Sequence, residues 1–197
     1  MATLEDTAVQ IAGIGHVYYA EPGAPEPTAA ELAAFDFDDP TTLPGWTWLG
    51  DTSSENLIEF GVDGGDSSVL RTWDRLNVRA SKEASTTTAT INSVNVSKDT
   101  IDLAFPGSAK NLTSGAWDLK LDGTVSKALL IVIVDGDLIS GFLFRNASIS
   151  GALPTLALDA FTEFPLTATI LAPASGTAVA YYEPAKSAAG ATAAPAS

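Results

Sequence analysis

The segment that most restricts the fold is a pair of apolar runs on either side of the dipeptide Asp135-Gly136. Residues 128–134 (ALLIVIV) precede this dipeptide, and residues 138–144 (LISGFLF) follow it. Asp-Gly suits the positive φ angles of a tight turn between antiparallel strands. Both runs have the length of strands and fall far short of a membrane-spanning helix. The chain is therefore expected to contain an antiparallel β-hairpin at this point.

Further strands are expected along most of the chain. They are rich in Thr, Val, Ile and aromatic residues or alternate in polarity, and they are bounded by turn-forming residues. The candidate segments are residues 8–20, 46–50, 57–62, a strand from about 69, 84–96, 116–123, and a final strand pair at 161–171 and 177–182. The sequence predicts a mainly β fold of roughly eight to ten strands, either a β-sandwich or a barrel, with long loops.

One short flanking α-helix is expected after Ser97. Ser97 can act as the N-cap, and Asp99 lies in the first turn, where the helix dipole favours an anion. Ile101, Ala104 and Phe105 form an apolar stripe, and Pro106 follows as a helix stop. A helix of this length is not stable alone, so it must pack on the sheet.

We expect a single domain over residues 1–182, with two excursions and a tail. Residues 21–45 hold five prolines, several acids and no base, which predicts a solvated surface insertion with a short helical turn at 28–34. Residues 51–74 are either a hairpin or an ordered loop that becomes structured against a neighbour. Residues 183–197 are mostly small, and we expect them to form a disordered C-terminal tail.

The charge is strongly acidic and unevenly spread. The net charge is −14, and residues 1–76 hold 14 acids against two bases, whereas residues 77–197 hold 10 against eight. Phosphate contacts require Lys and Arg, so such a chain is not expected to grip nucleic acid. Two interpretations remain open: the acids favour solubility, or they line a conduit through which nucleic acid slides without sticking.

No catalytic, cofactor-binding or metal site is predicted. The chain has no cysteine, which excludes disulfides, thiolate nucleophiles and Cys-based metal sites. Its single histidine, His16, lies in an apolar strand and is more typical of a core or interface than of catalysis. The acids around residues 63–66 and 135–137 fit turns and do not match a calcium loop. Spacing alone leaves a glycosidase-like carboxylate pair open, but nucleotide-binding glycine motifs are missing.

No membrane anchor is expected, because no apolar run approaches the roughly 18–20 residues that a spanning helix needs. The first ten residues begin with acids and lack a basic segment followed by an apolar one, so no secretory signal is expected. The protein is expected to be made and used in a cytoplasm.

Several segments taken in order resemble one known family. They are VYYAEPGAPEP (17–27), GWTWLGDTSSENLIEF (45–60), a tryptophan at position 73, and the Thr-rich strand running into a helix at 77–105. This order is similar to the major tail tube proteins of long, flexible-tailed phages, especially those of actinobacterial hosts. The resemblance covers about residues 8–172.

The resemblance implies a structural role in the virion, with assembly in the host cytoplasm and no enzymatic activity or cofactor. In that family the subunit is a β-sandwich or barrel flanked by a helix, and it closes hexameric rings that stack into a tube through which double-stranded DNA passes. The implied partners are other copies of the chain and the tape measure, tail terminator and distal tail proteins. Carried over, residues 51–74 would form the ring-stacking loop. The candidate inter-subunit residues are Trp46, Trp48, Asp51, Glu55, Asp63, Asp66, Arg71 and Trp73, the tryptophans being candidate packing anchors.

Two alternatives stay open at this point. The first is another β-rich virion component, such as a tail terminator, a head–tail connector or a capsid decoration protein. The second, from a different class, is a secreted carbohydrate-binding module or glycosidase-like domain, which would carry an export signal and aromatic residues on one sheet face.

Overall fold

The computed structural model describes residues 10–36, 39–40, 43–70, 73–74, 79–154, 156 and 158–187. Within these ranges the chain forms two helices and twelve strands. Their bounds are β1 Ile14–Ala20, α1 Ala29–Ala33, β2 Thr47–Trp48, β3 Glu59–Gly64, β4 Ser67–Leu70, β5 Arg79–Lys82, β6 Ser85–Ser93, α2 Lys98–Ala104, β7 Ala109–Lys110, β8 Trp117–Asp118, β9 Val125–Asp135, β10 Leu138–Gly151, β11 Phe164–Ile170 and β12 Val179–Lys186. The predicted mainly β fold is confirmed.

The predicted central hairpin is formed by β9 and β10. Asp135 pairs with Leu138, so the turn consists of two residues, and Gly136 has a φ of 60°. β10 is the longest strand, at 14 residues. It pairs with β9 along one side, while on the other side its first part pairs with β12 and its last part with β11. The sheet is therefore organised around β10.

β11 and β12 follow one another along β10 instead of pairing together. β11 ends opposite Ala147, and β12 begins opposite Phe144, where the register of β10 shifts. The prediction of a final strand pair is therefore wrong, because β10 is long enough to accept both strands in succession. The main sheet runs in the order β2-β1-β9-β10-β11-β6-β3, and its two end strands do not pair with each other. The fold is sandwich-like and is not a closed barrel.

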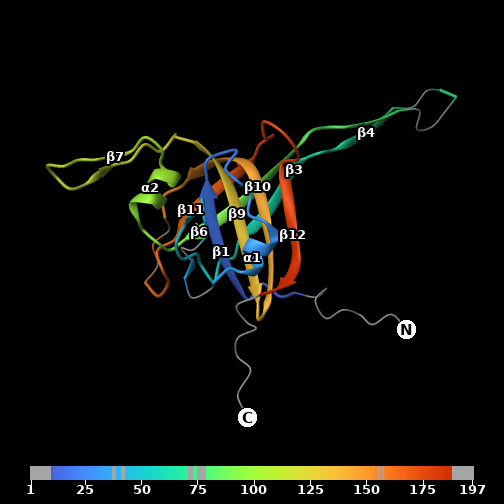
Figure 1. The fold of residues 1–197 in the computed structure, drawn as a ribbon. Coiled ribbons are helices and arrows are strands. Elements are labelled where there is room, and N and C mark those ends of the chain that lie inside the picture. The colour runs from blue at the N-terminus through green and yellow to red at the C-terminus, as the bar shows by residue number, and fades with distance from the viewer. Residues whose placement is uncertain are drawn as a thin grey trace, which may run out of the picture.

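The inner core lies between the two halves of this curled sheet (Figure 1). One half contributes β1 and β9, and the other contributes β6, β11 and the last part of β10. Helix α2 packs on β10 and β11 and adds Leu103 and Ala104 to this core, and its C-cap residue Phe105 adds a third buried apolar side chain. The predicted helix is confirmed, with Ser97 as N-cap accepting a hydrogen bond from the Thr100 amide at 3.1 Å.

A second core lies on the opposite face of β1, β9 and β10. Residues 21–46 cover it, and Leu32, Phe35 and Leu43 of this segment are each less than 5% exposed. The prediction of a solvated insertion is therefore wrong. Glu21, Glu26 and Glu31 and three of its prolines (Pro22, Pro25 and Pro44) are exposed, but its few large apolar side chains cover a sheet face that water would otherwise reach. The predicted helical turn is confirmed as α1, with a capping box between Thr28 and Glu31.

Two other strand boundaries differ from the expectation. In the predicted strand 116–123, only Trp117–Asp118 is extended, as one side of an exposed two-stranded hairpin with β7. The alternating side chains of this segment do not pack on the main sheet. At the C-terminal end, β12 continues to Lys186, beyond the predicted domain limit at residue 182. Pairing with β10 supplies the backbone hydrogen bonds that local composition does not predict. Residues 188–197 lie outside the described residues.

Candidate assembly surfaces

A long hairpin arm projects from the body. β3 pairs with β6 up to Gly64 and Ser85, and β4 pairs with β5 further out, so residues 59–93 form the two sides of one extended hairpin. Figure 1 shows this arm reaching far beyond the rest of the molecule. The predicted stacking loop, residues 51–74, is therefore not one loop. It comprises a short anchored segment, 51–58, and the outgoing side of the arm.

The anchored segment is fastened to β6 and to the start of β11. The backbone of Ser53 donates to Asn92 at 2.8 Å, and Thr52 forms a bridge with Ser93. The Glu163 carboxylate accepts from Ser53 Oγ at 2.5 Å and from Asn56 Nδ2 at 2.8 Å. These bonds hold the base of the arm against the sheet.

The seven predicted inter-subunit residues that the structure describes do not form one cluster. Trp46 is 7% exposed, belongs to the second core and donates from Nε1 to the Pro25 carbonyl at 3.0 Å. Trp48, in β2, is half-buried and packs against the same core. Both tryptophans thus pack within the subunit itself, and the prediction that they anchor a contact between subunits stays a prediction.

Asp51 and Glu55 lie in the anchored segment at the foot of the arm. The carbonyl of Asp51 accepts from the Val94 amide at 3.0 Å, and the Glu55 amide donates to Ser53 Oγ at 3.2 Å. Both side chains are exposed. Their backbone contacts shape the turn, while their carboxylates face solvent.

The remaining candidates belong to the arm. Asp63 on β3 and Asp66 after it are exposed. Trp73, between β4 and β5, is fully exposed at 102% relative accessibility. Arg71 lies outside the described residues. Of the three candidate tryptophans, Trp73 is therefore the one whose ring the subunit leaves free for a neighbour.

Open strand edges are a second assembly feature. Among the described residues β3 pairs only with β6, β12 only with β10, and β2 is a two-residue edge strand. An unpaired edge is a template for another chain. β12 carries Pro184 at a register shift, which is how natural edge strands limit uncontrolled pairing.

A third feature, which the sequence analysis did not single out, is the exposed apolar segment between β10 and β11. Its large side chains point into solvent and are Leu153, Leu156, Leu158 and Phe161. Four such residues within nine positions, next to a proline and outside any alternating pattern, could have indicated it. Exposed apolar patches of this kind mark interaction surfaces.

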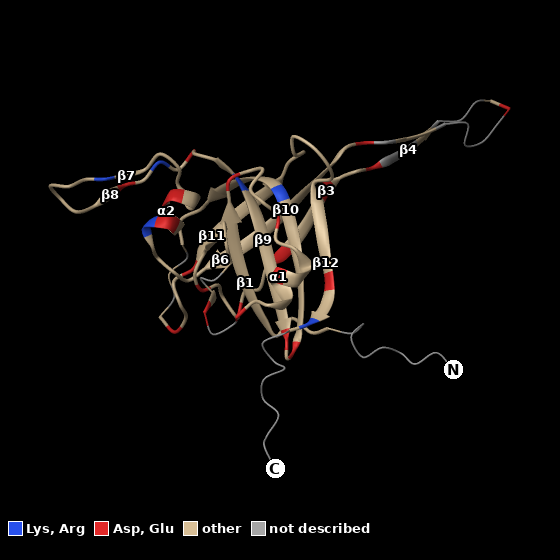
Figure 2. Ribbon diagram, viewed as in Figure 1, with Lys and Arg blue, Asp and Glu red and all other residues tan. Residues whose placement is uncertain are grey.

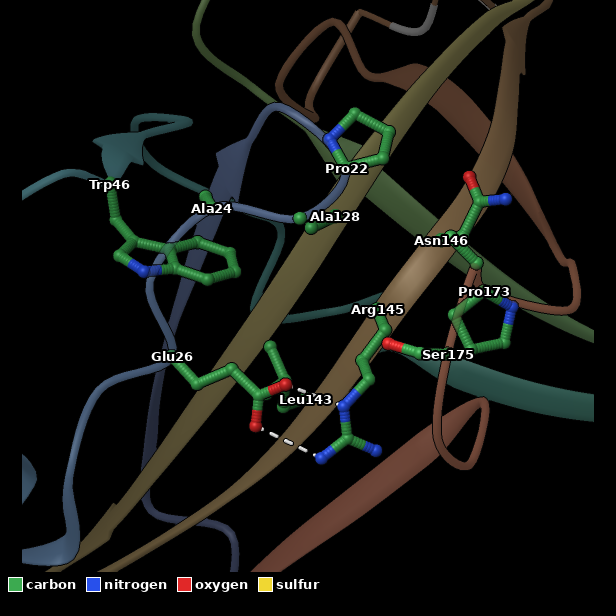
Figure 3. A pocket seen from close by; sticks show the side chains of 12 residues that line it. Pro22, Ala24, Glu26, Trp46, Ala128, Leu143, Arg145, Asn146, Pro173 and Ser175 are labelled. Carbon is green, nitrogen blue, oxygen red and sulfur yellow. Dashed lines mark hydrogen bonds and ion pairs between the residues drawn. The ribbon is translucent and has the colours of Figure 1, made fainter.

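The insertion is fastened to the sheet by polar contacts. Arg145 forms a two-pronged ion pair with Glu26 (Figure 3). Its Nη1 also donates to the carbonyl and Oγ1 of Thr177 at 2.7 and 2.8 Å. The hydrogen bond from Arg145 lowers the pKa of Glu26. Tyr182 donates to the Pro27 carbonyl at 2.7 Å. Glu26 and Arg145 also line a cavity of about 350 Å³, and there these two charged groups already satisfy each other.

The surroundings of His16 agree with the prediction that this histidine belongs to a core or an interface. Its ring meets Phe35 edge to face at a centroid distance of 5.6 Å, and burial lowers its pKa. Its Nε2 is buried without a hydrogen-bond partner in the described part of the chain. Described residues also include no cluster of three or more His, Cys, Asp or Glu side chains that could hold a metal ion. No helix within the described ranges is long and apolar enough to cross a membrane.

Figure 2 shows the charges spread over the arm, the loops and α2, with little on the sheet strands. β6 and β11 contain no charged residue at all. A β-body with open edges, a projecting arm and exposed apolar loops defines a structural subunit that assembles through its surface. The comparisons with known proteins agree: residues 2–194 match the family model "Phage tail tube protein", and the chain belongs to this family.

Two relatives are tail proteins of mycobacteriophages. The chain is 37% identical over 151 residues to the major tail protein Gp23 of Mycobacterium phage D29, covering 73% of this chain and 74% of that protein. It is 34% identical over 152 residues to the major tail protein Gp23 of Mycobacterium phage L5, with the same two shares. The protein is thus a structural component of a phage tail and not an enzyme.

Proposed function

We propose that this chain polymerises as stacked hexameric rings that form the tail tube, and that the phage genome passes through the channel of that tube. The observation that carries the proposal is the arm of residues 59–93. Its base, β3 and β6, belongs to the main sheet, whereas β4 and β5 extend away from the body. The arm presents Val62, Val69 and Trp73, all more than half exposed, to a neighbouring subunit.

The arm and the exposed apolar segment after β10 support head-to-tail stacking. In Figure 1 the arm leaves one end of the body, and the loop between β10 and β11 lies toward the other end. Different surfaces at opposite ends produce a heterologous contact, which generates an open filament when the copies do not close on themselves. Lateral contacts within a ring would then use the edges of β3, β12 and β2.

Partners at the ends and inside of the tube are part of the same proposal. A tube that grows by a heterologous contact leaves one unsatisfied arm surface and one unsatisfied receiving surface. We propose that a tail terminator and a distal tail protein cover these two ends, and that the tape measure protein occupies the channel during assembly.

The proposal is tested by removing the arm. Gly64 and Ser85 are directly paired, so residues 65–84 can be replaced by Asn-Gly, a two-residue turn that closes such a pair. Electron microscopy of the purified full chain should show tubes, whereas the arm-less variant should retain its β-sheet circular dichroism and stop at single rings or smaller species.

The matched control shortens the other exposed hairpin. Lys110 and Trp117 pair in the β7–β8 hairpin, so residues 111–116 can be replaced in the same way. We expect this variant to form tubes. A full chain that stays monomeric at high concentration would refute tube formation, and tubes of normal length without the arm would refute its role in stacking.

A further inference from the structure

One broad sheet face is left uncovered by the subunit. In β6 the residues Ala89, Ile91 and Ser93 are buried in the inner core, so Thr88, Thr90 and the other alternating side chains face the opposite way. β11 behaves likewise, with Leu166 and Ala168 inward. The outward face of β3, β6, β11 and the last part of β10 therefore has no layer packed on it within the described chain.

Strand register shows which side chains share this face. Directly opposed residues in adjacent strands point to the same side of a sheet. Two rows cross the strands, one running Ser126, Ser148, Thr169, Thr88, Gly61 and the next running Ser150, Thr167, Thr90, Glu59. We call these nine residues the hydroxyl face, because seven of them are Ser or Thr.

The other half of the sheet offers no comparable surface. β1, β9 and the first part of β10 have the inner core on one side, with Leu129 and Ile131. On the other side they have the second core, with Leu130 and Val132, beneath the insertion. Both faces of that half are occupied.

The cations that lie closest in sequence to the hydroxyl face are held by the insertion instead. Lys127 follows Ser126 and forms an ion pair with Glu21. Arg145 lies three residues before Ser148 and pairs with Glu26, with Nε at 2.5 Å from Oε1. Both partners belong to the insertion, which covers the second core. The nine residues of the hydroxyl face include no Lys or Arg and one acid, Glu59. Asp63, paired with Thr86, lies on the same side of the sheet, farther toward the arm.

A surface of this composition would let double-stranded DNA move along it without binding it firmly. Lys and Arg release counterions from DNA and bind its phosphates firmly, which would retain the duplex. Hydroxyl groups keep a layer of water that bridges weakly and exchangeably to phosphate oxygens. A row of Ser and Thr thus gives contact without retention, and it does so without a dense array of carboxylates.

We propose that the hydroxyl face lines the channel of the assembled tube, and that the backbone of double-stranded DNA passes over it through a layer of water. This inference rests on the proposed tube. It places the acidic insertion, with Glu21 and Glu26, on the outside of the tube. In this arrangement, the acidic side chains of residues 1–76 lie more on the exterior of the tube and on the arm than in the channel.

The absence of cysteine in the chain allows a direct test by thiol accessibility. The test variants are T167C and T90C on the hydroxyl face, and the matched control is A30C on α1, which lies on the insertion. Each is treated, as separated subunits and as assembled tubes, with N-ethylmaleimide and with a maleimide carried on a large polyethylene glycol.

In subunits we expect T167C, T90C and A30C to react with both reagents. In tubes the A30C thiol should still react with both, while the T167C thiol should react with the small reagent but at least about tenfold more slowly with the large one, because reaction requires access to the thiolate. Equal rates for T167C and A30C in tubes would overturn the channel assignment. So would protection of both T167C and T90C from the small reagent too, which would indicate a buried subunit interface.

The outcomes separate the two proposals. If no variant and no parent chain forms tubes, the proposed function fails, and the channel assignment fails with it. If tubes form and the hydroxyl face is open to the large reagent, the proposed function stands and only the channel assignment is rejected.

The role of the hydroxyl chemistry is tested in particles with T167K and T167S, and with A30K as the control. T167K adds cations that bind phosphate, so genome release should slow by about tenfold or more. T167S and A30K should release DNA at the parent rate. A parent-like rate for T167K in normally assembled tails would contradict passage over this face.

Discussion

Arg145 and Glu26 form a two-pronged ion pair between β10 and the insertion, across 119 positions of sequence. Nε lies 2.5 Å from Oε1, and Nη2 lies 2.9 Å from Oε2. Arg145 also follows the point where β10 passes from β12 to β11. The pair therefore connects the insertion to the place where the two halves of the sheet meet.

Breaking this ion pair should loosen the insertion. Glu26→Gln is expected to lower the free energy of unfolding by up to about 1 kcal/mol, the range of partly exposed ion pairs. Arg145→Ala should cost more, because it also removes the two bonds to Thr177. Urea unfolding followed by tryptophan fluorescence measures both variants. Lys98→Gln, in the exposed ion pair of α2, is the control and should change stability less.

The Glu26 contribution should also depend on pH. Hydrogen bonding by Arg145 lowers the pKa of Glu26 below its ordinary value of 4.5. A lowered carboxyl pKa means that the stabilisation is present above the unfolded-state value and disappears as the pH falls through the folded-state value. The difference in stability between the parent chain and Glu26→Gln should therefore shrink below about pH 4. A difference that stays constant down to pH 2 would show that the charge is not responsible.

The apolar side chains of the insertion should contribute as much to the free energy of unfolding as those of an ordinary core. Leu32→Ala and Phe35→Ala each leave a cavity in the second core, and each should lower the free energy of unfolding by roughly 2–4 kcal/mol. Leu112→Ala in the exposed β7–β8 hairpin should stay within about 0.5 kcal/mol of the parent. Equal, small effects at all three positions would restore the picture of a solvated flap.

Gly151 should not tolerate a side chain. A Cβ built there would lie 2.7 Å from the Cα of Ala104, so α2 would have to move away from β10. Gly151→Ala is expected to cost about 1–3 kcal/mol through overpacking. Gly15→Ala is the matched control, because its nearest atom would be 3.8 Å away and its φ is not positive. Thermal unfolding compares the two, and a Gly151→Ala variant as stable as the control would contradict the close contact.

His16 should make the fold less stable in mild acid. Burial lowers its pKa from 6.5 in the folded chain, so the unfolded chain takes up a proton first as the pH falls. Stability from the neutral ring is complete above about pH 6.5 and is lost as the pH falls toward the folded-state pKa. His16→Gln should flatten the dependence of the urea midpoint between about pH 7.5 and 5.5. An unchanged slope would mean that other groups titrate there.

Local sequence patterns are sufficient to predict those elements that depend on a few neighbouring residues. The hairpin around Gly136 and the helix after Ser97 are both predictable, because the tight turn and the N-cap are made by residues adjacent in sequence. The resemblance to tail tube proteins rests on ordered motifs of the same kind, and the family match confirms it.

The β-rich class, the central hairpin, the short helix and the family are thus all predictable from local patterns. The packing of residues 21–46 over a second core, the sharing of β10 by β11 and β12, and the burial of Trp46 beside an exposed Trp73 appear only in the folded chain. They could not be predicted because burial and strand pairing join residues far apart in sequence, as the contact between Glu26 and Arg145 does. A composition rich in proline and acid describes the outer side of the insertion, but it cannot show which sheet face a few leucine and phenylalanine side chains will cover.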